Sequence, residues 1–305
     1  MFSESLRACL WTFRQEPLTR LTNQTPSRRI WFDAFDLLCN YRGIGWTWPQ
    51  GLQIPKETRN VKSTKAFMLT TLQWLILSLI VFDFCHYAVQ VMLLKSNGSL
   101  TGSIFDPSLP PLLRYTRSTI ITILCGFVIF LGVENQYNIT TLIAVGLFRQ
   151  SPTLWPPVSA RPYRATSLNQ FWTIGWHQSF REIFISFGGK PFAYFFGKAG
   201  GVMGAFLISG ILHDLGCWGL GRGTDPRKVL GFFLMNGVGL ILESVYKSAT
   251  GKRVGGVAGL IWTYIWVVGW GNLLTDAWFE RGLATSRYWP PQSSPAFWVH
   301  SILFG

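Results

Sequence analysis

Residues 66–94 read AFMLTTLQWLILSLIVFDFCHYAVQVMLL, and this stretch decides the fold class. Its apolar run is longer than the about 20 residues that a helix needs to cross a bilayer. A helix that packs on a soluble core would instead pair an apolar stripe with a polar face. The stretch therefore predicts a helix that spans a membrane.

Four further apolar blocks follow along the chain. They lie at about 118–148, 199–220, 229–246 and 256–274. The first of these four is too long for one straight crossing, and the polar run 134–136 interrupts it, so we expect it to be tilted, kinked or split. The apolar stretch 296–304 is too short to span and is expected at the interface. The sequence thus predicts an all-α polytopic membrane protein of about five to seven transmembrane helices, with 66–305 as its membrane-embedded domain.

Charged residues are scarce and unevenly placed. Hydrophobic residues make up 49% of the 305 residues and charged residues only 13%, whereas an average soluble domain is about 25% charged. Ten of the 27 Lys and Arg residues lie between Arg7 and Lys65, ahead of the first apolar block. The positive-inside rule therefore predicts that 1–65 is a cytosolic segment beside anionic lipid headgroups. Although the net charge is +13, no basic tract is interleaved with aromatic residues for base stacking, so no nucleic acid partner is expected.

An amphipathic helix is predicted within the segment 1–65. Apolar side chains recur at Trp31, Ala34, Phe35 and Leu38, which is the i, i+3, i+4, i+7 spacing of a helix with one apolar face. We expect this helix to lie on the membrane surface. No secretory signal peptide is expected, since the first 20 residues mix Arg, Glu and Gln with the apolar residues.

The connection at about 149–198 has a different character. Four prolines between positions 152 and 162 exclude a helix in its first part. Ser167 and Gln170 then fit a capping box, in which Ser167 caps the start of a helix. We expect an aromatic helix over 168–187 that ends at Gly188-Gly189.

Absent motifs exclude several classes of function. The four histidines, at 86, 177, 213 and 300, are too few and too scattered for the clustered boxes of di-iron membrane enzymes. The sequence has no H-E-x-x-H, no G-x-S-x-G, no Walker loop and no G-x-G-x-x-G after a strand. The five cysteines are odd in number and widely spaced, so neither a disulfide framework nor a metal site is expected.

His213 is the strongest catalytic candidate. It lies inside the apolar block 199–220, where an ionisable side chain is costly and usually faces a cavity or the bundle interior. Ser209, Gly210 and Gly216 lie three or four positions away, and such small residues leave room for a neighbouring helix or for a substrate. Burial keeps an imidazole neutral and able to accept a proton. The alternative is a core histidine bonded to a carbonyl of another helix.

His177 is a second candidate and lies in the expected aromatic helix. On a helix it shares a face with Arg181 at i+4, while Trp172 and Trp176 share the adjacent face. This pattern fits an interfacial helix with an aromatic belt. It also fits a cytosolic gate at which Arg181 meets the phosphates of a nucleotide-like ligand.

Both histidines stand in motifs that resemble the membrane-bound O-acyltransferases, and within them the wax-synthase-like branch common in fungi. Residues 167–181 look like that branch's S-L-x-x-F-W…W-H-x-x-x-R pattern, and residues 209–214 look like its S-G-x-x-H-[DE] pattern. Residues 31–46 are also similar to fungal members. The resemblance covers about residues 30–275, which is most of the chain.

This resemblance implies a helical membrane fold with a reaction tunnel, a cytosolic entrance for acyl-CoA, and His213 as the catalytic base. His177 would be the second catalytic residue, at a position where other members often carry Asn. Acyl-CoA would be a co-substrate, and no bound cofactor or metal is expected. The residues that the resemblance assigns to substrate binding are Asn169, Trp172, Trp176, Arg181, Ser209 and Asp214.

The chain departs from the family pattern in two places. Residues 173–175 replace the small-plus-basic run that often precedes the position of Trp176. Family members also usually carry one or more spanning helices ahead of the region that matches 31–46.

The function expected from the resemblance is acyl transfer, acetyl included, from CoA to the hydroxyl of a hydrophobic terpenoid, sterol or fatty alcohol. We expect it in the endoplasmic reticulum membrane and in secondary metabolism. Two alternatives stay open. One is a polytopic transporter that uses Asp83, His86 and His213 as a proton relay. The other is a catalytically inactive short homologue.

Overall fold

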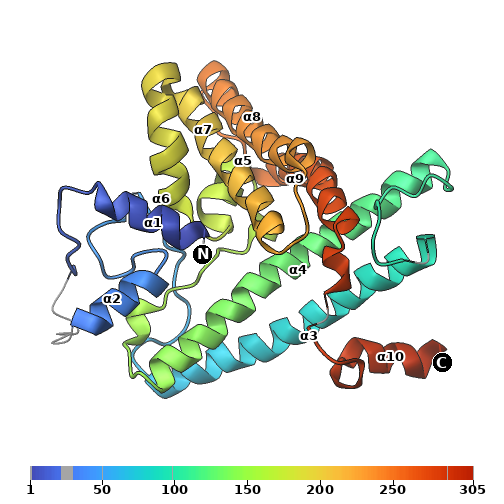
Figure 1. Ribbon diagram of the computed structural model, residues 1–305, viewed down its shortest axis with the longest axis horizontal. Helices are drawn as coiled ribbons and strands as arrows, with labels where there is room; N and C mark the ends of the chain where they lie inside the picture. The colour runs from blue at the N-terminus through green and yellow to red at the C-terminus, as the bar shows by residue number, and fades with distance from the viewer. Residues whose placement is uncertain (1, 22–29, 50, 98, 287, 305) are drawn as a thin grey trace.

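The protein is a bundle of helices (Figure 1). The computed structural model describes residues 2–21, 30–49, 51–97, 99–286 and 288–304, and these ranges contain no strand. Five segments within them are long and apolar enough to cross a membrane, which confirms the predicted all-α polytopic fold. The α-helices of the described ranges are α1 Phe2–Thr12, α2 Ile30–Cys39, α3 Thr64–Asn97, α4 Pro111–Gly146, α5 Leu168–Gln170, α6 Arg181–Phe184, α7 Lys190–Gly219, α8 Pro226–Thr250, α9 Gly256–Glu280 and α10 Pro295–Phe304.

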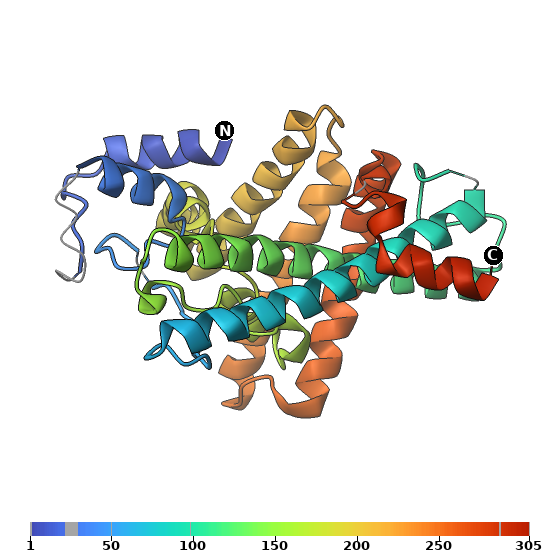
Figure 2. The same ribbon diagram turned by 90° about the horizontal axis from the view of Figure 1, so that it is seen from below.

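Helices α3 and α4 form a long antiparallel pair that runs the length of the molecule (Figures 1 and 2). α4 is continuous over 36 residues, so the polar run 134–136 does not split it. Its length of about 54 Å exceeds the about 30 Å of a bilayer core, so α4 must cross at a tilt or project beyond the core. Asn135 is accommodated in mid-helix because its Oδ1 accepts a hydrogen bond of 2.5 Å from Ser78 Oγ of α3.

Helices α7, α8 and α9 lie side by side and cross that pair (Figure 1). α8 packs against both of its neighbours in this group, and α9 contacts α4. A buried apolar cluster joins α8 to α9, and its members are Val229, Phe232, Phe233, Leu274 and Ala277. This cluster forms one wall of the site described below.

The segment after Ser167 is not the single helix predicted over 168–187. Ser167 caps its start as expected, because its Oγ accepts a hydrogen bond of 3.0 Å from the backbone N–H of Gln170. The Gln170 side chain accepts from the backbone N–H of Thr166, at 2.8 Å, and not from that of Ser167 as a capping box requires. After α5, however, the chain forms a π-helical turn over Phe171–Gly175 and becomes extended at Trp176. The helix starts again only at Arg181, the first residue of α6.

The proline-rich loop explains this break. The backbone N–H of Ala160 donates to the carbonyl oxygens of both Ile174 and Gly175 at 3.1 Å. An uninterrupted helix would need those carbonyls for its own next turn. The contact is close, since a Cβ at Gly175 would lie 3.3 Å from Pro162 Cα. The interruption is therefore imposed by a tertiary contact.

Gly188 and Gly189 do not end a helix, contrary to the prediction. The helix passes through both of them (η4, Ile185–Gly189) into α7 and reverses at Gly197, whose φ of 65° lies in the left-handed region. A Cβ at Gly188 would lie only 2.0 Å from the carbonyl oxygen of Gly204. The two glycines are thus needed where the arms of this helical hairpin cross closely, as small residues are in membrane helix packing.

The N-terminal segment contains α1 and α2. α2 forms where the amphipathic helix was predicted, and Trp31, Phe35 and Leu38 are exposed on it. Arg7 of α1 is buried and donates to the carbonyl oxygens of Leu37 and Leu38 at 2.7 and 3.0 Å. The two short helices are therefore held together through the C-terminal end of α2.

Asp83 and His86 of α3 contact the start of the C-terminal helix α10 and the loop that precedes it. The Asp83 carboxylate accepts hydrogen bonds from Ser294 Oγ and from the backbone N–H of Ala296, at 2.9 and 2.8 Å. The His86 ring packs edge-on against Tyr288. α10 has only 10 residues, which agrees with the prediction that this stretch does not span.

Candidate active site

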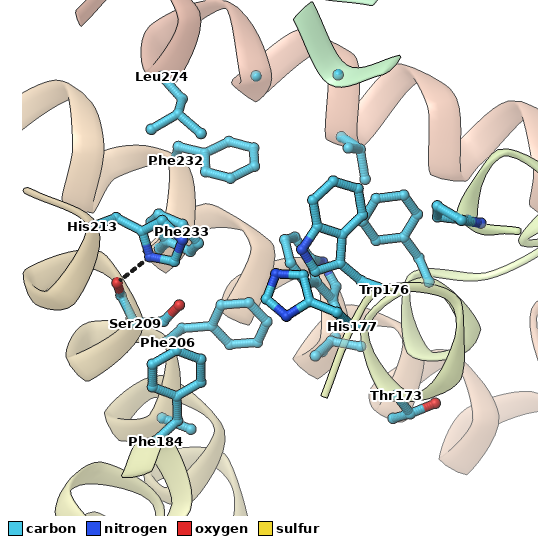
Figure 3. A pocket seen from close by; sticks show the side chains of 18 of the residues that line it. Thr173, Trp176, His177, Phe184, Phe206, Ser209, His213, Phe232, Phe233 and Leu274 are labelled. Atoms are coloured by element: carbon cyan, nitrogen blue, oxygen red, sulfur yellow. Dashed lines mark hydrogen bonds between the residues drawn. The ribbon is translucent and has the colours of Figure 1, made fainter. Parts of the chain in front are cut away.

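A cavity of about 680 Å³ is enclosed by α4, the turn before α6, the α6–α7 hairpin, α8 and α9. His213 lines it from α7 and His177 from the turn, so the structure brings the two predicted catalytic histidines to one space (Figure 3). Four of the predicted substrate-binding residues also line this cavity. They are Trp172, Trp176, Arg181 and Ser209.

His213 has a defined tautomer. Its Nδ1 lies 2.7 Å from the backbone carbonyl oxygen of Ser209, one helical turn earlier. A carbonyl oxygen can only accept, so Nδ1 must carry the proton, and Nε2 then has a free lone pair. Figure 3 shows this second ring nitrogen turned toward the interior of the pocket. The Phe233 ring packs against the His213 ring, with the two ring centroids 4.5 Å apart and the ring planes tilted by 34°.

The three small residues near His213 differ in their surroundings. A Cβ at Gly210 would lie 3.2 Å from Leu230 Cα, so this glycine lets α8 approach α7. Gly216 has open space instead, because outside its own turn of helix no atom of the described residues would lie within 4 Å of a Cβ placed there. Ser209 lines the cavity and also supplies the carbonyl that orients His213.

His177 lies between two aromatic side chains. Its ring centroid is 5.8 Å from that of Trp176 and 6.0 Å from that of Phe180. Its Nδ1 is buried and has no hydrogen-bond partner among the residues that the structure describes. Burial, with smaller contributions from the nearby His213 and Arg42, lowers the pKa of His177 to about 4, so the ring is neutral at physiological pH.

The predicted shared helical face of His177 and Arg181 does not exist. The chain is extended at Trp176, and α6 starts only at Arg181, so the i, i+4 relationship does not apply. Both side chains nevertheless line the cavity. The tertiary fold therefore brings them together in a way that helical periodicity does not describe.

Arg181 lies where the cavity meets a second, polar recess of about 420 Å³. Gln178 and Lys190 also line both spaces. The far wall of the recess comes from the N-terminal segment, including Arg14, whose Nη1 lies 3.5 Å from Glu182 Oε1. The apolar cavity and the polar, basic recess thus share part of their wall.

Two predicted substrate-binding residues do not line the cavity. The backbone N–H of Asn169 donates to Glu243 at 3.0 Å. Asp214 is buried and its Oδ1 accepts a hydrogen bond of 2.7 Å from the backbone N–H of Asp225, which ties the end of α7 to the start of α8. Asp83 and His86, the other members of the relay considered above, also lie outside the cavity lining.

A large part of the wall comes from helices that carry no motif. α4 contributes Thr122, Gly126 and Phe130, and α9 contributes Gly271 and Leu274. Nothing in their sequence distinguishes these residues from ordinary membrane-helix residues, because only the crossing of α4 and α9 makes them neighbours. Among the described residues, no three His, Cys, Asp or Glu side chains gather in a way that could hold a metal ion.

Residues 155–235 match the model of the membrane-bound O-acyl transferase family, and this segment contains both cavity histidines. The chain is a relative of the membrane-bound O-acyltransferases. The wax-synthase-like resemblance is also confirmed. The chain is 30% identical over 146 residues to a long-chain-alcohol O-fatty-acyltransferase of Simmondsia chinensis, covering 44% of this chain and 40% of the relative.

Two fungal proteins show a similar relationship. An acetyltransferase of Aspergillus fumigatus is 26% identical over 189 residues, covering 53% of this chain and 32% of that protein. An O-mevalon transferase of Penicillium terrestre is 25% identical over 254 residues, covering 73% of this chain and 54% of that protein. The chain thus aligns with about a third to a half of the length of these proteins. No solved structure matches it.

Proposed function

We propose that this chain is an acyl-CoA:alcohol O-acyltransferase with His213 as its catalytic base. The observation that carries the proposal is the free Nε2 of an oriented imidazole inside a largely apolar cavity. Because the cavity wall is largely apolar, the lone pair of Nε2 is best placed to accept a hydrogen bond, and then the proton, from the hydroxyl of a bound substrate. The resemblance of 155–235 to the acyltransferase family supports the same reading.

The reaction needs no covalent enzyme intermediate. The alcohol oxygen attacks the thioester carbonyl while Nε2 of His213 takes the hydroxyl proton. The resulting tetrahedral intermediate collapses to the ester and expels the CoA thiolate, which receives that proton from the imidazolium. A cavity with a largely apolar wall limits competing hydrolysis, because it holds little water beside the thioester.

His177 has a role that suits a neutral histidine. A neutral imidazole carries one N–H, and this group can donate a hydrogen bond to the oxyanion of the tetrahedral intermediate. Burial keeps the pKa of His177 at about 4, so the ring does not become a competing acid at neutral pH. Asn, which other family members often carry here, also offers an N–H donor.

Arg181 suits the donor end of the site. A guanidinium binds phosphate oxygens through paired N–H groups, and acyl-CoA carries phosphates at the far end of its pantetheine arm. We place the nucleotide of CoA in the polar recess, and the thioester between His177 and His213. Trp172 and Trp176 would then flank the pantetheine arm. Asn169 and Asp214 would affect substrate binding only indirectly, by holding their own segments of the chain against α8.

The acceptor is proposed to be a hydrophobic alcohol. The aromatic and aliphatic walls contributed by α4, α8 and α9 suit a terpenoid, sterol or fatty alcohol. The names of the relatives include an acetyltransferase, a long-chain-alcohol O-fatty-acyltransferase and an O-mevalon transferase. We favour a short acyl group, acetyl included, since one fungal relative is named an acetyltransferase. We also favour a role in secondary metabolism, which the fungal relatives support.

The charge pattern supports an orientation in the membrane. We propose that 1–65 lies on the cytosolic surface of the endoplasmic reticulum, with the exposed apolar side chains of α2 in the headgroup layer. Residues 66–305 would form the embedded catalytic domain. The recess for CoA would then open toward the compartment that holds acyl-CoA.

Microsomes that express the chain test the proposal. They receive acetyl-CoA or long-chain acyl-CoA with a panel of fatty, sterol and terpenoid alcohols, and mass spectrometry detects the esters. An ester that the parent makes and that microsomes without the protein do not make supports the proposal and names the substrate class. Normal expression without any ester across the panel would contradict it and favour the inactive-homologue alternative.

A further inference from the structure

Glu243 of α8 is a buried carboxylate that the proposed reaction does not use. Only 9% of its surface is exposed, and it lies within a membrane-spanning helix. No Lys or Arg in the described part of the chain forms an ion pair with it. A buried acidic group in such a place is costly, so its presence there points to a specific role.

The partners of Glu243 point to that role. Its two oxygens accept hydrogen bonds from the backbone N–H groups of Leu168 and Asn169, at 2.6 and 3.0 Å. A third donor is Nε1 of Trp262 on α9, at 3.0 Å. The first two amides belong to the start of the segment that carries Trp172 and His177 into the cavity.

Two further residues of α8 contact the same segment. Asn236 is fully buried, and its Oδ1 accepts a hydrogen bond of 3.1 Å from Trp172 Nε1. Gly239 lies between them, and a Cβ there would lie 2.4 Å from Leu168 Cδ1. Positions 236, 239 and 243 fall on one face of a helix, since they are three and four residues apart. One stripe of α8 therefore holds this segment.

Glu243 also completes the amide bonding of the segment. Ser167 Oγ satisfies the N–H of Gln170, and Glu243 satisfies those of Leu168 and Asn169. The first amides of a helix have no partner within the helix, so an external acceptor is what fixes where it begins. The local sequence supplies one acceptor, and α8 supplies the other.

We infer that Glu243 is a positioning residue, which fixes the segment 168–177 so that His177 and Trp172 meet the substrate opposite His213. The kinetic part of this inference rests on the proposed function, and the tethering part does not. Misplacing a catalytic group by about 1 Å costs about 100-fold in rate. Glu243→Gln keeps one acceptor oxygen but turns an NH₂ group toward backbone donors, so it loosens the segment without removing its bulk.

The test uses two readouts on the full-length protein in lipid nanodiscs. The first is hydrogen–deuterium exchange, for which Glu243→Gln is expected to speed exchange in a peptide that covers 167–171. Asp83→Asn is the matched control, because Asp83 similarly accepts from a serine hydroxyl and a backbone N–H, but at α10. It is expected to speed exchange near 294–297 and to leave 167–171 unchanged.

The second readout is a double-mutant cycle on ester formation. Glu243→Gln is expected to lower kcat about 10- to 100-fold with little change in the KM for acyl-CoA. In a His177→Ala background the same substitution should lower kcat less than about threefold, because the catalytic side chain that it positions is gone and only Trp172 is left to misplace. A purely structural role would lower both by the same factor.

Unchanged exchange at 167–171, or equal factors in the two backgrounds, would overturn the inference. If Glu243→Gln does not fold, Glu243→Asp is used, since it keeps the charge and withdraws the carboxylate by one methylene. If the parent makes no ester, the proposed function fails. The exchange result then decides by itself whether Glu243 holds the segment.

Discussion

The Nδ1 of His213 lies 2.7 Å from the carbonyl oxygen of Ser209, and this bond leaves Nε2 as the acceptor that faces the cavity. The bond lies within one turn of α7, so the helix itself sets the ring orientation. Proton acceptance at this site therefore needs no charged partner to choose the tautomer.

Acid should destabilise the protein partly through His177. Its folded pKa of about 4 lies below the usual value of 6.5, so between these values only the unfolded chain binds the proton. This contribution to stability is fully present above pH 6.5 and declines as the pH falls toward 4. The fall in Tm from pH 7.5 to pH 5 should therefore be smaller for His177→Asn than for the parent, when both are measured in the same detergent and without ligand. Equal losses would contradict the burial of His177 as a neutral ring.

The helical hairpin should not tolerate a methyl group at its crossing. A Cβ at Gly188 would lie 2.0 Å from the Gly204 carbonyl oxygen, so Gly188→Ala must push the arms apart at a cost of about 1–3 kcal/mol or more. Gly216→Ala is the control, because nothing lies within 4 Å of its Cβ. Thermal unfolding followed by fluorescence-detected size exclusion should show a lowered Tm for the first variant only. Similar Tm values for both would show that the arms do not cross as described.

The cavity wall at Gly126 should set the size of the substrate. This glycine of α4 lines the cavity, and a Cβ placed there meets no atom within 4 Å. Gly126→Leu should therefore project into the cavity and shift the ester products toward smaller acyl or alcohol groups, measured by competition between short and long substrates. Gly269→Leu adds the same side chain at an exposed glycine of α9 outside the cavity lining, and it should leave the product distribution unchanged. A shift with both variants, or with neither, would contradict the assignment of this wall.

Arg181 should matter only for donors that carry phosphates. Arg181→Gln is expected to raise the KM for acetyl-CoA about tenfold, since a charge-assisted hydrogen bond to a phosphate contributes about 1.5–3 kcal/mol. The rate with S-acetylpantetheine, which lacks the nucleotide, should change little. Lys252→Ala provides a control at an exposed loop cation. An equal loss with both donors would place the role of Arg181 elsewhere than at the phosphates.

Much of the site can be predicted where the signal is local. The Ser167 cap depends on four consecutive residues, and it forms as predicted. His213 can be recognised from the sequence because an ionisable side chain within an apolar helix is costly and is usually functional. Five spanning segments can be predicted for the same reason, since length and apolarity are properties of the segment alone.

The incorrect predictions depend on distant contacts. Gly188-Gly189 has the same sequence signature whether it ends a helix or lets two helices cross, and only the approach of Gly204 distinguishes the two. The break at Trp176 depends on hydrogen bonds that the backbone N–H of Ala160 donates to the carbonyl oxygens of the preceding turn. The walls formed by α4 and α9 arise from their crossing, which no motif records.

The central claim is that His213 is the base, and one paired substitution tests it most directly. His213→Gln keeps a polar side chain but removes the basic nitrogen, and His300→Gln makes the same change on α10, where the ring packs against Tyr87 and lies outside the cavity. Ester formation by the purified variants is measured with the donor and alcohol that the parent uses. Loss of about 10²–10⁴ in kcat for His213→Gln, with His300→Gln near the parent, is the predicted result. A His213→Gln variant that folds and forms ester at the parent rate would contradict it.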